Sequence, residues 1–175
     1  VIGLCHNRLA IVDLSRQGIQ PMHVDDGRYT ISFNGEIYNW KELRVTLKKK
    51  GCIFQTNTDT EVILLGYKQF GVSILQKIRG MYAFAIWDSK EEVLFCARDR
   101  VGKKPFVYSE TDNGFFFSSE IPALLSVRKI AKINTNTSAN GLANMLLHNL
   151  RHIPEPCTAY QGINKLRPGH ALMVK

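Results

Sequence analysis

The sequence predicts an α+β fold built on antiparallel sheets. Short stretches rich in β-branched and aromatic residues follow one another, and turn signals such as Asp25-Asp26-Gly27 and Asp112-Asn113-Gly114 join them. Residues 39–50 begin with a capping pattern, and residues 61–70 carry apolar residues at helical spacing, so both favour helices. Strands that meander around a few helices are typical of the α+β class.

The remaining elements follow from the same local signals. We expect strands at residues 9–12, 28–33, 52–55, 81–87, 92–97, 106–108, 115–118 and 171–174. We expect helices at residues 39–50, 61–70, 73–78, 119–125 and 138–150. In this arrangement one strand ends at Phe33, and Asn34-Gly35-Glu36 forms the turn before the helix that Asn39 caps.

Composition limits the class of protein. The chain has 175 residues, 45% of them hydrophobic and 22% charged, as in an ordinary globular domain with a core. Its net charge of +8 raises the question of a nucleic-acid or membrane partner, but no basic-aromatic motif accompanies the lysine clusters at residues 48–50 and 103–104. We therefore expect no nucleic acid and no membrane as partners, and a nucleic-acid binder is the last of the alternatives.

Targeting signals and cysteines point to a location. No apolar run approaches the ~20 residues of a membrane-spanning helix, and residues 1–5 lack the basic and apolar regions of a signal peptide. The four cysteines are widely spaced and form no CxxC pair. This usage favours reduced thiols, no metal site and a cytoplasmic location.

The segment Asn34-Gly35-Glu36 presents an amide, a residue without a Cβ and a carboxylate together. Gly35 lets its own N–H approach a ligand closely, and Asn34 can direct its NH₂ group at the same point. Two donors that converge on one oxygen make an oxyanion hole. The same tripeptide is equally compatible with a β-turn whose polar residues have no further role.

Further motifs occur in a fixed order along essentially the whole chain. They are His6-x-Arg8-Leu-Ala-Ile-Val-Asp13, Gln20-Pro21, Phe33-Asn-Gly-Glu-Ile-Tyr-Asn39, Thr58-Asp-Thr-Glu61, Gly80-Met-Tyr-Ala-Phe-Ala-Ile-Trp-Asp88, Arg98-Asp-Arg-Val-Gly-Lys-Lys-Pro105, Ser119-Glu120 and Leu166-Arg-Pro-Gly-His170. The sequence thereby resembles the glutaminase domain (class II, N-terminal nucleophile) of glutamine-dependent asparagine synthetases. The resemblance implies one amidotransferase domain over residues 1–175, with the four-layer αββα sandwich of N-terminal-nucleophile hydrolases.

The resemblance also implies a glutamine site made of Arg8, Asn34, Gly35, Glu36 and Asp59. Arg8 would grip the α-carboxylate bidentately. Glu36 and Asp59 would offer carboxylates to the α-ammonium or to the amide NH₂. Asn34 and the Gly35 N–H would hold the oxyanion. Without the resemblance, Asp59 has a simpler interpretation as a favourable charge near a helix N-terminus.

Two parts of the family pattern are missing from the sequence. The family's nucleophile is an N-terminal cysteine whose α-amino group acts as the base, and it stands several tens of residues before Arg8. Here only seven residues precede Arg8, beginning with Val1, so we expect the nucleophile and the N-terminal strands to be absent. Cys5 does not replace it, because its nitrogen is a peptide amide; we expect a buried core thiol within a strand.

The synthetase half of the family's enzyme is also missing, since the chain has no Ser-Gly-Gly-x-Asp-Ser pyrophosphate loop. We expect a domain truncated at both ends and inactive by itself. This domain needs no cofactor; ATP and Mg²⁺ belong to the absent synthetase domain. Partners are then glutamine and that synthetase domain, and a homodimer is left open.

The sequence leaves three hypotheses for the function. The first is the glutaminase part of an asparagine-synthetase-type ligase. The second is an amidotransferase with another acceptor, such as a sugar or a polysaccharide precursor, and the third is a catalytically dead glutamine-binding or structural module. Residues 98–105 do not indicate a phosphate loop, because they lack its spacing and precede a strand; we interpret Arg98 and Asp99 as a structural ion-pair corner.

Overall fold

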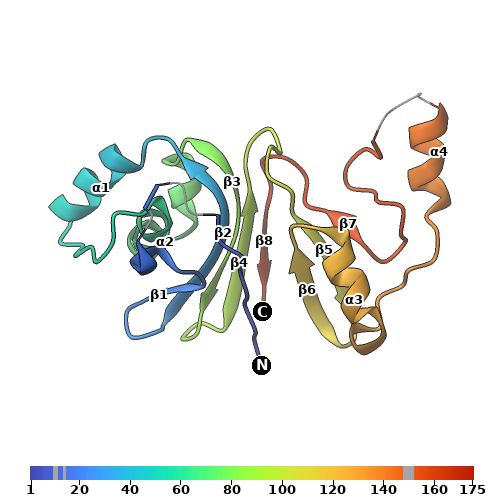
Figure 1. Ribbon diagram of the computed structural model, residues 1–175, viewed down its shortest axis with the longest axis horizontal. Coiled ribbons are helices and arrows are strands. Elements are labelled where there is room, and N and C mark those ends of the chain that lie inside the picture. The colour runs from blue at the N-terminus through green and yellow to red at the C-terminus, as the bar shows by residue number, and fades with distance from the viewer. Residues whose placement is uncertain (10–11, 14, 148–151) are drawn as a thin grey trace. The chain divides into compact units, whose positions relative to one another are not determined.

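Figure 1 shows the computed structural model of the chain, which describes residues 1–9, 12–13, 15–147 and 152–175. The chain divides into two compact units. The first comprises Val1–Ala97 with Leu172–Lys175, and the second comprises Arg98–Ala171. Each unit contains one antiparallel sheet with helices, so the predicted α+β class is confirmed.

The sheet of the first unit has five strands in the order β1-β2-β3-β4-β8. Their bounds are β1 Met22–Val24, β2 Tyr29–Ile37, β3 Gly80–Asp88, β4 Val93–Arg98 and β8 Ala171–Val174. The turn signal at residues 25–27 forms the β1–β2 hairpin, with Val24 opposite Tyr29. β2 then pairs with β3 along its whole length, from Tyr29 opposite Asp88 to Ile37 opposite Gly80.

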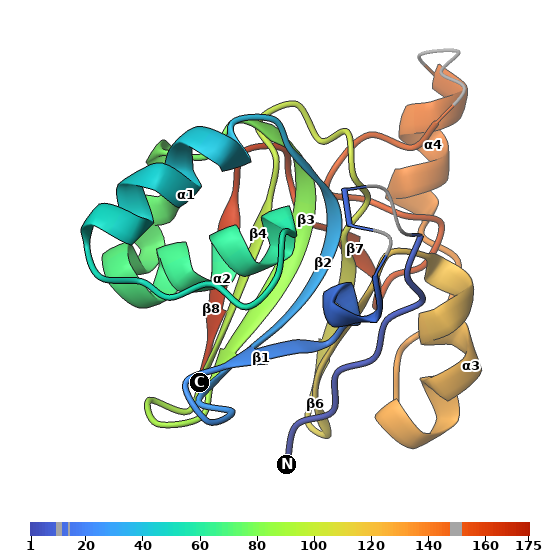
Figure 2. The ribbon, with the colours of Figure 1, turned by 60° about the vertical axis from the view of Figure 1, so that its left-hand side comes forward.

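Two helices lie on one face of this sheet, α1 (Trp40–Lys49) and α2 (Asp59–Phe70), and Figure 2 shows them there. Every residue of α2 from 59 to 66 is buried. The alternation of β2 directs Ile31 and Phe33 into the same core. α2 therefore lies deep in the unit, and its N-terminus is fixed close to β2. Two short 3₁₀ helices, η1 (Arg16–Gly18) and η2 (Gly71–Gln76), complete the unit.

The sheet of the second unit has three strands in the order β6-β5-β7. The elements are β5 Val107–Thr111, β6 Gly114–Ser118, β7 Asn164–Lys165, α3 Ile121–Ala131 and α4 Ala139–Leu147. Val107 and Leu124 are buried in a small core between β5 and α3. No helix among the described residues is both long and apolar enough to cross a membrane.

Most of the expected elements form, and the exceptions have local causes. The strand expected at residues 52–55 is absent, and Ile53 is exposed. Phe54 instead packs against Arg44, whose Cζ lies 4.2 Å from the centroid of the Phe54 ring. The helix expected at residues 73–78 is the 3₁₀ helix η2, and the one expected at 119–125 begins later and continues to Ala131.

Two further expectations are corrected at their ends. Asn39 is the N-cap residue of α1 but makes no capping bond, because its side chain binds Arg79 N and Lys77 O at 2.9 Å each. Leu9, at the start of the strand expected at residues 9–12, is exposed and has no strand structure. Residues 10–11 of that strand and 148–150 of the last helix lie outside the described residues.

Candidate functional site

Among the residues that the structure describes, no strand pairs with one edge of β2 beyond Ile31, because β1 pairs only with residues 29–31. Two side chains bind this edge in its place. The amide of Gln20 accepts from Phe33 N (2.7 Å) and donates to Phe33 O (3.1 Å), and the Asp59 carboxylate accepts from Ile37 N (2.9 Å). Strand peptide groups face the same edge at every second residue. The N–H and C=O of Gly35 therefore face this edge, midway between the two side-chain contacts.

Position 35 has no room for a side chain. A Cβ there would lie 2.2 Å from Met81 O and 2.8 Å from Tyr82 Cα, both of them backbone atoms of β3. The expectation that Asn34-Gly35-Glu36 forms a turn is thus wrong: the tripeptide stays inside β2, because pairing with β3 continues past it to Ile37. Glycine is required here for close approach of two strands.

The side chains of Asn34 and Glu36 stand on the face of β2 opposite Phe33, because strand residues alternate. Ser32 shares that face, and its hydroxyl lies 3.4 Å from Cys5 O and 3.4 Å from His6 Nδ1. The N-terminal segment therefore runs along the face that carries Asn34 and Glu36. Both side chains are partly buried.

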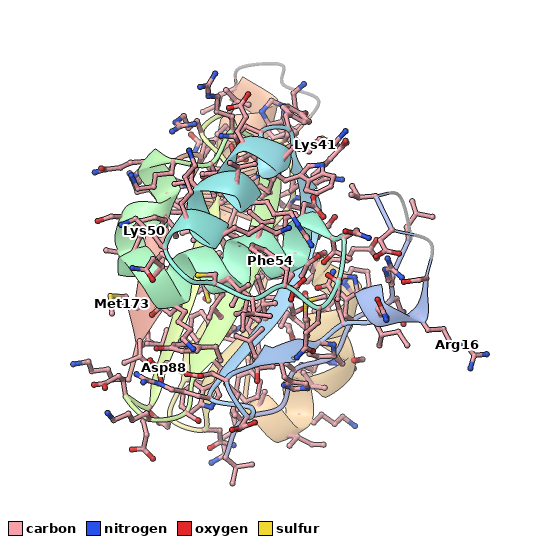
Figure 3. The ribbon with its side chains drawn as sticks, turned by 90° about the vertical axis from the view of Figure 1, so that its left-hand side faces the viewer. Arg16, Lys41, Lys50, Phe54, Asp88 and Met173 are labelled. Carbon is pink, nitrogen blue, oxygen red and sulfur yellow. The ribbon has the colours of Figure 1, made fainter. Side chains whose placement is uncertain are left out.

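Arg8 is held by the loop that follows it. Its guanidinium donates to Ser15 O at 2.9 Å and also to Asp13 O. It lies so close to Gly18 that a Cβ there would be 2.2 Å from Arg8 Nη2 and 2.9 Å from Thr58 Cγ2. Arg8 and the residue before Asp59 thus pack against the same α-carbon. Arg16 on η1, by contrast, points outward (Figure 3).

The positive charge of Arg8 affects the pKa of the nearby His6. Partial burial, and after it the Arg8 guanidinium, lowers the pKa of His6 below its ordinary value. His6 is therefore neutral at pH 7, and Arg8 is the positively charged group of this segment.

The start of α2 is fixed by a buried polar network. Thr58 is the N-cap residue, and its hydroxyl accepts from Glu61 N at 3.1 Å. The Glu61 carboxylate accepts from Gln55 N, Thr56 N and the Thr56 hydroxyl, at 2.7 Å each. Sequence reasoning matched this motif but gave Glu61 no role; the Thr-x-x-Glu spacing of a capping box was the available signal.

Asp59 is almost fully buried at the first helical position of α2. Burial raises the pKa of its carboxyl, and the charge of Glu36 raises it further, while N–H donors from Ile37, Thr60 and its own backbone oppose the shift. Glu36 and Asp59 are thus close enough to repel one another. A cation placed between them would relieve that repulsion.

Four of the five expected residues lie close together around β2: Asn34, Gly35 and Glu36 are consecutive in the strand, and Asp59 binds Ile37 N at its edge. Arg8 lies against the loop that adjoins the start of α2. All five belong to the first unit. The described ranges hold no group of three His, Cys, Asp or Glu side chains placed to bind a metal.

The expectation for Cys5 is wrong. Cys5 is exposed, because residues 1–9 form no strand that could cover it. The buried core thiol is Cys96 on β4, where burial raises the thiol pKa to about 12.

The corner at Arg98 and Asp99 is structural, as we expected, but the contacts that build it are mainly hydrogen bonds between these two side chains and backbone groups. The Asp99 carboxylate accepts from Lys103 N and Lys104 N, at 2.9 Å each. The guanidinium of Arg98 donates to three backbone carbonyls, those of Gly102, Lys104 and Leu166. Arg98 also forms an ion pair with Glu155, with 3.5 Å between Arg98 Nη1 and Glu155 Oε1. These contacts fold the loop onto itself.

Comparison with known proteins identifies the family. The model of the glutamine amidotransferase domain matches residues 1–175, and the chain belongs to this family. The putative asparagine synthetase [glutamine-hydrolyzing] 2 of Methanocaldococcus jannaschii is 41% identical over 94% of the chain and 34% of its own length. Asparagine synthetase [glutamine-hydrolyzing] 1 of Bacillus subtilis is 35% identical over 99% of the chain and 26% of its own length.

Among solved structures, the glutamine phosphoribosylpyrophosphate (PRPP) amidotransferase of B. subtilis superposes with a TM-score of 0.59 and 27% identity. The superposition covers 70% of this chain and 28% of that one. The chain therefore spans about a third or less of the length of these relatives.

Proposed function

We propose that the chain is the glutaminase part of an asparagine-synthetase-type amidotransferase, which hydrolyses glutamine to supply ammonia. Family membership supports glutamine as the substrate, and the names of the two asparagine synthetases support aspartate amidation as the use of the ammonia. In that reaction ATP adenylates the aspartate carboxylate with release of pyrophosphate, and the ammonia then displaces AMP to give asparagine.

The observation that carries the proposal is the free edge of β2 at Gly35, between the contacts at Phe33 and Ile37. The Gly35 N–H faces an edge at which none of the described strands pairs, and the preceding residue is Asn34. Hydrolysis of an amide develops negative charge on the carbonyl oxygen. The Gly35 N–H and the Asn34 side-chain NH₂ stabilise that charge, and each such donor contributes about 3 kcal/mol in comparable sites.

The charged groups suit the other end of glutamine. Arg8 binds the α-carboxylate, because a guanidinium has five donors and two backbone carbonyls occupy only part of them. Glu36 and Asp59 bind the α-ammonium, whose positive charge offsets the effects of burial and of the Glu36 charge, both of which raise the pKa of Asp59. Binding glutamine should therefore lower the pKa of Asp59 and keep it ionised.

The nucleophile is proposed to be an N-terminal cysteine outside these 175 residues, with its own α-amino group as base. By itself the 175-residue chain is expected to bind glutamine without hydrolysing it. ATP and Mg²⁺ serve a synthetase domain elsewhere in the polypeptide, and the reaction is placed in the cytoplasm.

A second candidate has the same chemistry at glutamine and another acceptor for the ammonia. It is favoured by the likeness to the glutamine PRPP amidotransferase of B. subtilis, an amidotransferase that is not named for aspartate. Identity over most of the chain is higher with the proteins named asparagine synthetases. For that reason aspartate is preferred as the acceptor.

The test is glutamate release from glutamine by the full-length native polypeptide. Asn34→Ala should lower kcat about 10²- to 10³-fold. The matched control is Asn113→Ala in the second unit, where the amide binds Ile130 O, and it should leave kcat unchanged. Glutamine binding without glutamate release would favour the dead binding module. An Asn34→Ala variant that behaves like the control would contradict the assigned oxyanion hole.

A further inference from the structure

Gln20 is bound to β2 as a neighbouring strand would be. Its side-chain amide satisfies both polar groups of Phe33, accepting from the N–H at 2.7 Å and donating to the C=O at 3.1 Å. Phe33 is itself buried, with 3% of its surface exposed. A buried peptide group without a partner is costly, so Gln20 fixes this part of the strand edge.

Gln20 also connects the separate pieces of the site. The same Nε2 that binds Phe33 lies 3.5 Å from the Thr60 hydroxyl, in the first turn of α2 beside Asp59. Gln20 follows the loop whose Gly18 packs against the Arg8 guanidinium. One side chain therefore ties the β2 edge to α2, while its backbone continues from the Arg8 loop.

We propose that Gln20 is a positioning residue for glutamine hydrolysis, which holds the Gly35 N–H at the angle that the developing oxyanion requires. The inference rests on the proposed glutaminase function. Gln20 and Asp59 fix the peptides at Phe33 and Ile37, two residues to either side of Gly35. The edge of β2 is thus held in place on both sides of Gly35, and the Gly35 N–H between these contacts stays available to a ligand.

The effect should appear in the chemical step. The Gly35 N–H gains its partner as charge develops, so an edge that has lost one of its two anchors stabilises the transition state less. Substrate affinity depends mainly on Arg8, Glu36 and Asp59, which keep their own contacts. We therefore expect kcat to fall about 10- to 100-fold, in line with the cost of a misplacement of about 1 Å, while KM changes less than about threefold.

Two substitutions separate hydrogen bonding from packing. Gln20→Met keeps the length of the side chain and removes both hydrogen bonds. Gln20→Glu keeps an acceptor for Phe33 N, but its carboxylate repels Phe33 O; once protonated, the acid donates to that carbonyl again. The activity of Gln20→Glu relative to wild type should therefore rise as the pH is lowered through the titration of this carboxyl, and Gln20→Met should show no such recovery.

The matched control is His23→Ala on the same hairpin, which removes a 2.8 Å hydrogen bond between His23 Nδ1 and the Thr30 hydroxyl. It should lower thermal stability without lowering kcat. All variants are measured in the full-length native polypeptide by glutamate release and thermal unfolding. If Gln20→Met does not fold, Gln20→Glu carries the test, since it keeps one of the two bonds.

The outcomes are distinguishable from those of the proposed function. If wild type releases glutamate and Asn34→Ala is impaired, but Gln20→Met keeps the wild-type kcat, the positioning role is refuted and the glutaminase stands. A rise in KM at constant kcat would also refute it. If wild type releases no glutamate at all, the proposed function itself fails.

Discussion

Replacing Gly35 by alanine tests the strand arrangement on which the site depends. The added Cβ would lie 2.2 Å from Met81 O and 2.8 Å from Tyr82 Cα, so β2 and β3 must separate locally to admit it. Overpacking of this kind costs typically 1–3 kcal/mol, and contacts with backbone rather than flexible side chains place Gly35→Ala at about 3 kcal/mol. In a chain of this size that corresponds to a fall in Tm of about 6–12 °C.

The control is Gly27→Ala in the β1–β2 turn. Gly27 has φ +85° and nothing within 4 Å of an added Cβ, so only backbone strain of about 1 kcal/mol is expected. Both tryptophans, Trp40 and Trp87, belong to the first unit, and their fluorescence during urea unfolding reports on that unit. If Gly35→Ala costs no more than Gly27→Ala, the close approach of β2 to β3 at Gly35 is refuted.

Three further outcomes are expected. Glu61→Gln should lower the free energy of unfolding by about 2 kcal/mol, because a buried carboxylate that accepts three hydrogen bonds is lost. The control Glu42→Gln, at an exposed position, should change this free energy little. Equal urea midpoints for the two variants would argue against the network around Glu61. Burial raises the pKa of Asp59 in the folded state, so the free energy of unfolding should fall as the pH rises from about 4 through that pKa. Asp59→Asn should remove this fall. If Asp59→Asn shows the same dependence of stability on pH as wild type, the raised pKa of Asp59 is contradicted. Cys5 should react with a thiol reagent in the native protein and Cys96 only after unfolding, as mass analysis of labelled peptides would show; early labelling of Cys96 would contradict its burial.

Local sequence signals were sufficient where an element pairs with its neighbour in the chain. The apolar runs at residues 81–87 and 92–97 correctly predict β3 and β4, and the turn signal at Asp25-Asp26-Gly27 correctly marks the turn before β2, although β1 at residues 22–24 was not expected. α2 is equally well predicted, because its apolar residues repeat at helical spacing and its residues 59–66 are buried. In these places local preference and tertiary packing agree.

Non-local pairing explains the principal error at the site. Asn34-Gly35-Glu36 has the composition of a turn, and nothing local indicates that β3, more than forty residues further on, pairs through it. The identity of the expected site residues did not depend on this, since it came from the resemblance. What the sequence did not reveal is the direction of the Gly35 peptide, which follows from the register.

Side-chain contacts between residues far apart in the chain could likewise not be predicted from the sequence. Gln20 belonged to a matched motif, but no periodicity indicates that its amide binds Phe33, thirteen residues away. Cys52–Gln55 alternates like a strand, yet none of the strands that the structure describes pairs with it. A pattern of period two describes one face of a strand and does not supply its partner.

The most direct test of the central claim follows the amide resonance of Gly35 during a titration with glutamine. The chain has thirteen glycines, so labelling with ¹⁵N-glycine gives a simple spectrum, and the loss of one peak in Gly35→Ala assigns it. Glutamine should shift the Gly35 resonance, whereas asparagine, one methylene shorter, should not bring its amide to this edge. A Gly35 resonance that stays in place while glutamine shifts other glycines would contradict the assignment of this edge as the glutamine site.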